Sequence, residues 1–140
     1  MTRSRAVVTT AIAVLALALP GCNASFSTAN VSKATLATDQ AGENPTTTFA
    51  PDQAFYYVVD LANAPDDTRV RAVWTAVEVD AEGAEPNTVI DEASVTTGSG
   101  QIFFDLTNDG PWPPGTYKVD LYLDEGKEPA ETAELTVEEG

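Results

Sequence analysis

Apolar and polar residues alternate along most of the chain from Val31 onward. The clearest alternation lies in 116–124, where every second residue from Tyr117 to Leu123 is apolar. A period of two indicates a β-strand with one face in the core and the other in water. The same pattern recurs between turn-forming residues and predicts seven strands, with no stretch of helical periodicity. The predicted strands are 31–38, 53–61, 68–79, 88–96, 101–106, 116–124 and 132–138.

The segments between these strands are rich in residues that favour turns. Residues 39–51 contain Gly, Pro and Asn and predict an irregular loop, and 107–115 contains three prolines, which fix backbone angles. Gly98, Ser99 and Gly100 predict a hairpin between the fourth and fifth strands. Glu125 and Gly126 predict a tight hairpin turn before the last strand.

Strands with one buried face and one solvent-exposed face indicate two sheets that stack on each other. Seven short strands in about 110 residues therefore predict an all-β, immunoglobulin-like, two-sheet antiparallel sandwich. Two features add to this resemblance. Trp74 lies on the third strand, where immunoglobulin-type domains bury a tryptophan. The segment 115–119 resembles the tyrosine-corner segment through Tyr117, with Val119 where disulfide-linked relatives have cysteine.

A wider set of markers is similar to that of small sandwich domains in uncharacterised exported bacterial lipoproteins. The markers are Phe49-Ala50-Pro51, Ala64-Pro65, Trp74, Trp112-Pro113 and Gly115-x-Tyr117. The resemblance covers 31–137 and implies the sandwich fold. It implies no catalytic or ligand-binding residue, because its markers are structural.

The N-terminus has the three parts of a signal peptide. Arg3 and Arg5 form a basic head, and the run 6–19 is apolar apart from two threonines. A helix that spans a bilayer needs about 20 apolar residues, so this run is too short to remain as an anchor. Pro20 and Gly21 then end any helix. The sequence therefore predicts export.

Leu19-Pro20-Gly21-Cys22 resembles the lipobox of bacterial lipoproteins, with Pro20 where a small residue is usual. The resemblance implies cleavage before Cys22 and attachment of a diacylglycerol to its thiol, and several acyl chains together make membrane binding stable. The alternative is an ordinary secretory signal peptide that is cut elsewhere and leaves Cys22 free. We therefore expect a signal peptide at 1–21, a flexible tether at 22–30 and the sandwich at 31–138, which is one domain.

The chain is strongly acidic, with 22 Asp and Glu against 7 Lys and Arg and a formal net charge of −15. Nucleic-acid binding needs clusters of lysine and arginine, so this balance argues against a nucleic-acid partner. The charge also repels anionic lipid, so we expect the domain to stand away from the membrane that anchors it. The plainest role of the charge is to keep the domain soluble.

The absence of histidine and the single cysteine exclude most catalytic and metal chemistry. Ser-His and Cys-His nucleophiles cannot form, the commonest metal ligand is missing, and one cysteine allows no internal disulfide. Neighbouring carboxylates such as Asp66 and Asp67 are interpreted as solvated surface groups. We predict no enzyme activity, no catalytic residue, no cofactor and no metal site.

Calcium in a loop remains an open alternative to this expectation. Residues 105–110 begin like an EF-hand loop, whose carboxylates would suit calcium. Thr116 stands where that motif needs a bidentate glutamate, so the motif is incomplete.

Three aromatic residues are candidate ligand contacts. Trp112 lies in the proline-rich loop, where an exposed indole would stack on a sugar ring or anchor a peptide. The alternative is that Trp112 folds back as a lid over the core. Tyr56 and Tyr122 occupy outward positions of their strands.

These features predict a non-enzymatic binding or structural module, anchored by lipid in the cell envelope, whose partner is an unknown envelope protein or glycan. The alternative is a carbohydrate- or peptidoglycan-contacting domain that uses the Trp112 loop, and a small hydrolase is a third hypothesis. Asn23, and not aspartate, follows Cys22. This resembles lipoproteins of the outer membrane, or of the outer leaflet of the cell membrane in a single-membrane organism.

We expect the protein to incorporate radioactive palmitate when it is expressed in a bacterium with a lipoprotein pathway. Cys22→Ser removes the only thiol, so this variant should carry no label. A wild-type chain without label would contradict lipidation and favour an ordinary signal peptide.

Overall fold

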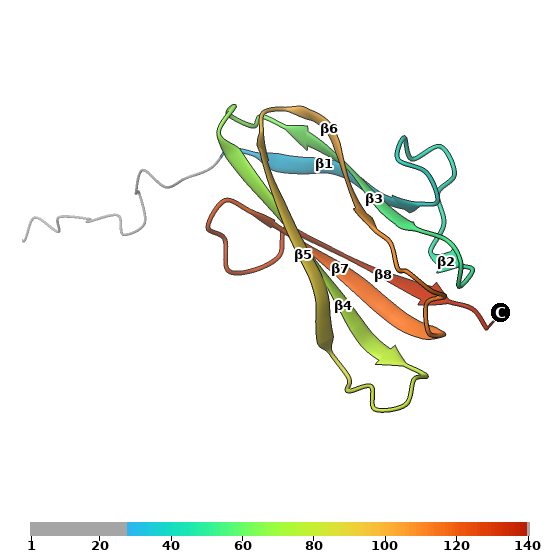
Figure 1. Ribbon diagram of the computed structural model, residues 1–140. Coiled ribbons are helices and arrows are strands. Elements are labelled where there is room, and N and C mark those ends of the chain that lie inside the picture. Colours follow the sequence, from blue (N-terminus) through green and yellow to red (C-terminus); the bar gives the residue numbers. More distant parts are fainter. Residues whose placement is uncertain (1–27, 140) are drawn as a thin grey trace, which may run out of the picture.

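The computed structural model describes residues 28–139, which form two β-sheets packed face to face (Figure 1). The predicted signal peptide and Cys22 lie outside the described residues. Within 28–139 no helix has the length and apolarity to span a bilayer. The strands are β1 (Asn30–Ala37), β2 (Thr48–Phe49), β3 (Phe55–Ala62), β4 (Thr68–Val79), β5 (Thr88–Thr97), β6 (Gly100–Leu106), β7 (Gly115–Leu123) and β8 (Glu131–Val137).

The two sheets differ in width. One has three strands in the order β1-β3-β6, and the other has five in the order β2-β8-β7-β4-β5. Every pairing is antiparallel except that of the two-residue strand β2 with β8, which is parallel. The all-β sandwich predicted from the alternation is thus confirmed. β2 was not predicted from the sequence, because two residues within 39–51 are too few to show an alternation.

The core lies between the sheets and contains the faces that the alternation predicts. Trp74 is almost fully buried on β4, as expected for an immunoglobulin-type tryptophan. Its indole nitrogen has no acceptor within hydrogen-bond distance among the described residues. The largest fully buried side chains are Trp74, Tyr57, Phe49, Phe55, Leu121 and Leu135.

The tyrosine corner is confirmed at the start of β7. The Tyr117 hydroxyl donates a hydrogen bond of 2.6 Å to the carbonyl oxygen of Pro113, four residues upstream. Gly115 sits inside this corner at φ 147°, a conformation that favours glycine. A β-carbon there would collide with the backbone of Glu78 and Val79 on β4. The corner therefore joins the proline-rich loop to the wider sheet.

The hairpin predicted at Gly98 to Gly100 is wrong. β5 pairs with β4, whereas β6 pairs with β3, so the chain crosses from one sheet to the other at this point. Gly100 has φ 137°, and a β-carbon on Gly98 would lie 2.6 Å from a carboxylate oxygen of Asp66. The same glycines suit a hairpin or a tight crossing, and alternation shows only which face is buried, not which strand is the partner.

A tight turn is present near Glu125 and Gly126, but it does not by itself connect the two strands as predicted. β7 and β8 form a hairpin whose loop spans 124–130. The amide of Gly126 donates to the carbonyl oxygen of Leu123 at 3.0 Å, and the chain continues to Ala130 before β8 begins. The turn is one part of a longer hairpin loop.

The loop 38–46 covers the outer face of the narrower sheet. The Asp39 carboxylate accepts hydrogen bonds from the backbone amides of Glu43 (2.9 Å) and Asn44 (2.8 Å). These bonds favour the charged form and lower the pKa of Asp39. Gly42 in this loop packs against Val58 of β3, so Val58 is buried although its side chain points away from the core.

We expect Gly115→Ala to destabilise the domain by about 2–3 kcal/mol, because the new methyl group collides with the backbone of β4. Gly110→Ala is the matched control, since nothing lies within 4 Å of the position of its β-carbon. Equilibrium unfolding in urea measures both variants. Equal stability of the two would contradict the close approach at Gly115.

Candidate functional site

An apolar cleft of about 430 Å³ lies at one end of the sandwich. It is bounded by the last residues of β4, the first residues of β5, the connection between these strands and the loop that follows β6. Its principal lining residues are Ala76, Val79, Ile90, Trp112, Pro113 and Tyr117. We call this end of the molecule the cleft end. The opposite end, where β1 begins and where β5 connects to β6, is the tether end (Figure 1).

The cleft exists because the two sheets do not match in width. β5 is the edge strand of the wider sheet, and nearly all of its residues are exposed. From their connection at the tether end, β5 and β6 diverge toward the cleft end (Figure 1). The pairing of β4 with β5 also shifts register beyond Trp74, which leaves Ile90 as an extra residue in the ladder. Ile90 is 39 % exposed and forms part of the cleft wall.

Trp112 lies in the wall of the cleft and is 8 % exposed. Its ring stacks on Phe55, with centroids 4.7 Å apart, and meets the Tyr117 ring edge-on at 5.8 Å. Its indole nitrogen donates to the carbonyl oxygen of Gln53 at 3.0 Å. The interpretation of Trp112 as an exposed stacking platform is therefore wrong, and the alternative of a lid over the core is correct. Only a small part of the indole surface is exposed in the cleft.

Tyr56 and Tyr122 lie on the outer faces of opposite sheets. Tyr56, on β3, has its ring centroid 6.1 Å from that of Phe103 on β6. Tyr122, on β7, lies under the guanidinium of Arg71 at 4.5 Å, and Arg71 also forms an ion pair of 2.9 Å with Glu92. The fold thus brings none of the three candidate ligand contacts together.

Sequence reasoning missed the exposed apolar residues of the edge strand. Val89 is 57 % exposed, and Ile90 and Val95 are also exposed. One signal was available, because the adjacent pair Val89-Ile90 breaks the alternation of 88–96 as a bulge does. Phe103, which is 43 % exposed on the outer face of β6, was missed as well.

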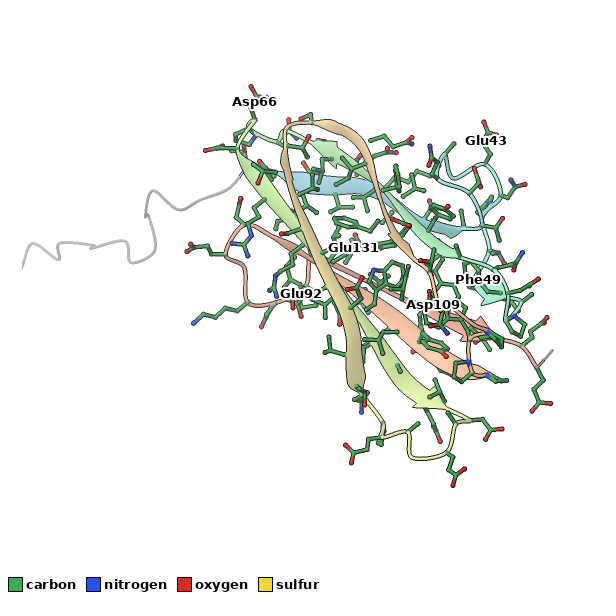
Figure 2. All side chains as sticks on the ribbon, in the orientation of Figure 1. Glu43, Phe49, Asp66, Glu92, Asp109 and Glu131 are labelled. Carbon is green, nitrogen blue, oxygen red and sulfur yellow. The ribbon has the colours of Figure 1, made fainter. Side chains whose placement is uncertain are left out.

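The rim of the cleft is acidic. The segment 78–92 contains six carboxylates and neither lysine nor arginine. Of these six, Glu85 lines the cleft itself. Glu92 does not belong to this rim, because it pairs with Arg71 on the outer face of the wider sheet. Figure 2 shows Asp109 in the loop that follows β6, which borders the cleft.

Titratable groups inside the cleft are few. Burial raises the pKa of Tyr117 to about 12, so its hydroxyl stays protonated and continues to donate to Pro113. Among residues 28–139, no group of three or more Asp, Glu, His or Cys side chains is placed to hold a metal ion. The site offers apolar surface with negative charge around it.

The architecture and the tyrosine corner define an immunoglobulin-like β-sandwich. Solved structures agree with this class. An immunoglobulin-like protein from Pseudomonas aeruginosa superposes with a TM-score of 0.55 at 11 % identity, over 79 % of this chain and 96 % of that one. The C-terminal domain of wzt superposes with a TM-score of 0.52 at 8 % identity, over 82 % of this chain and 76 % of that one.

A similar domain occurs within a larger protein. The β-glucosidase from Listeria innocua, solved in complex with glucose, superposes with a TM-score of 0.51 at 16 % identity. The match covers 80 % of this chain but 16 % of the glucosidase. The sequence matches no family model and no curated protein. At such identities the likeness shows the fold alone.

We expect Trp112→Ala to destabilise the domain by about 3 kcal/mol or more, because the stacking on Phe55 is lost and a cavity forms. Val89→Ala, at an exposed position of the edge strand, should change stability by less than about 0.5 kcal/mol. Urea unfolding measures both. A cost for Trp112→Ala as small as that of Val89→Ala would mean that Trp112 is not a lid.

Proposed function

We propose that the protein is an exported, lipid-anchored component of the cell envelope, and that its sandwich is a non-enzymatic module that binds a partner through the apolar cleft. The observation that carries this proposal is the cleft itself. It is concave and mostly apolar, as binding sites usually are, and it lies on strand ends that a packed core holds rigid.

The position of the cleft suits a module tethered at its N-terminus. The chain enters the sandwich at the tether end, where Thr28 bonds to the carbonyl oxygen of Asn63 and Asn30 pairs with Ala62. β4 runs from this end to the cleft with 12 residues, which corresponds to about 40 Å. A lipid on Cys22 would hold the tether end toward the membrane, and repulsion between the acidic domain and anionic lipid would favour the cleft end pointing outward.

The module is proposed to be non-enzymatic because the cleft is poor in reactive groups. Glu85 is the one carboxylate among the residues that line it. Hydrolysis by acid and base needs two such groups on either side of the scissile bond, and the sequence has no histidine to replace one of them.

The carbohydrate alternative has a narrower basis. The fold also occurs within a glucosidase solved with glucose, and an indole lies in the cleft wall. Stacking on a sugar needs an open ring face, however, and Phe55 covers one face of Trp112 while Tyr117 meets the ring from another side. We therefore favour a partner with an aliphatic group over a glycan.

A photo-crosslinking amino acid placed at position 90 should form an adduct with the partner in the native envelope. The same amino acid at position 66 is the control, because Asp66 is exposed at the tether end, away from the cleft (Figure 2). An adduct at 90 and none at 66 supports binding at the cleft. Adducts at both positions or at neither, in protein that fractionates with the membrane, would contradict it.

A further inference from the structure

Strand β5 presents an unpaired backbone edge next to the cleft. It is the last strand of the wider sheet, and within 28–139 it pairs with β4 alone. In an antiparallel pair, the residues bonded to one neighbour alternate with residues whose N–H and C=O groups point the other way. Over ten residues, β5 therefore offers several free donors and acceptors along one line.

This edge and the cleft form a continuous surface. Thr88 and Ile90 belong to β5 and also line the cleft. Val95 lies further along the same strand and is exposed. A strand added beside β5 would therefore bond through its backbone and lay a side chain into the cleft, a recognised mode of binding extended peptides.

The charge on this surface identifies the kind of segment that fits. Asp91 is paired with Trp74 across the ladder, so its carboxylate is on the core-facing side of β5, where it is exposed beside Ile90. Glu85 lies in the cleft wall, and the whole segment 78–92 lacks a basic residue. An added strand that carried lysine or arginine would complement these carboxylates, whereas an acidic strand would be repelled.

The same charges oppose a second copy of this chain. Each copy has a formal net charge of −15, and two β5 strands side by side would bring Asp91 close to acidic residues of the other copy. Inward-pointing charges and bulges on edge strands are known means of preventing self-pairing, and β5 has both. The charge disfavours a second copy and favours a strand of opposite charge. The bulge is confined to Ile90, so the regular part of β5 beyond it is the part that can accept an added strand.

We propose that β5 receives, as an added strand, an extended basic segment of a partner protein, with one aliphatic side chain of that segment seated in the cleft beside Trp112. This rests on the proposed function and names the chemistry of its partner. Backbone bonds to β5 provide affinity, the cleft selects the aliphatic side chain, and Glu85 and Asp91 select positive charge.

The test uses a short peptide of alternating lysine and valine with leucine at its centre as the probe. In amide NMR, the peptide should shift signals of β5 and the cleft and slow hydrogen exchange of β5 amides. The affinity should fall as salt is added, because the charges are exposed. A peptide with glutamate in place of lysine should bind at least about tenfold more weakly. N-methylation of the lysine peptide on its pairing edge should abolish the protection of β5.

Variants of the protein separate the role of local charge from that of total charge. Glu85→Gln with Asp91→Asn should weaken binding of the lysine peptide about five- to tenfold. Glu43→Gln with Asp66→Asn changes the net charge equally, on loops outside the cleft, and should leave binding unchanged. All four side chains are substantially exposed or lie in loops, so the variants should fold, which the amide spectrum also reports.

Three results would overturn the inference. The first is an absence of amide shifts at a few millimolar lysine peptide. The second is binding of the glutamate peptide or the N-methylated peptide that equals that of the lysine peptide. The third is a set of β5 shifts that depend on protein concentration without peptide, which would indicate a second copy. If position 90 forms an adduct in the envelope but the lysine peptide leaves β5 unprotected, the binding function stands and the added strand is rejected. If the peptide binds as described but no adduct forms, β5 can accept an added strand, but the proposed function and the partner protein that the inference names are rejected.

Discussion

The ring of Phe55 is the contact on which the cleft end depends. It lies at the start of β3 and packs against four other aromatic rings, those of Phe49, Trp74, Trp112 and Tyr117. Phe55 belongs to the narrower sheet, whereas its partners come from β2, β4 and β7 of the wider sheet and from the proline-rich loop. Aromatic pairs add to the stability that burial provides, because their edges and faces carry opposite partial charge. One side chain therefore fixes the distance between the sheets and the position of the loop.

The proposed binding surface follows from this cluster together with the unequal width of the sheets. The cluster closes the core beneath the three-stranded sheet, but β5 extends past the strands that could cover it. Trp112 illustrates the division, because most of its indole belongs to the core while the remainder belongs to the cleft wall. Trp112 thus contributes both to the core and to the proposed binding surface.

Most of the fold was predictable because alternation depends on local sequence. The buried faces of β3, β4, β7 and β8 follow directly from their period of two, and Tyr117 was identified with its corner because glycine, threonine and tyrosine lie side by side. The crossing at Gly98 to Gly100 was not predictable in this way. A glycine turn is compatible with two strands in one sheet or in two, and the choice depends on which distant strands are free to pair.

The candidate site was harder to predict from the sequence than the fold, for a related reason. The cleft depends on the absence of a covering strand over β5, which is a property of the assembled sheets and not of any segment. Tyr56 and Tyr122 were correctly placed on outward faces, but alternation does not show that these faces belong to opposite sides of the molecule. The only sequence signal for the exposure of Val89 and Ile90 is that these two adjacent apolar residues interrupt the alternation of 88–96.

The parallel pairing of β2 with β8 has a consequence for the time at which the domain can close. Phe49 is held against Val137 by this pair, and the amide of Glu138 donates to the carbonyl oxygen of Phe49. β8 also lies between β7 and β2, so the wider sheet stays incomplete until the last strand of the sandwich has been synthesised. Pairings between segments so far apart in sequence form slowly. The wider sheet therefore cannot close from its early strands alone, and the core residue Phe49 gains its strand pairing only when β8 is available.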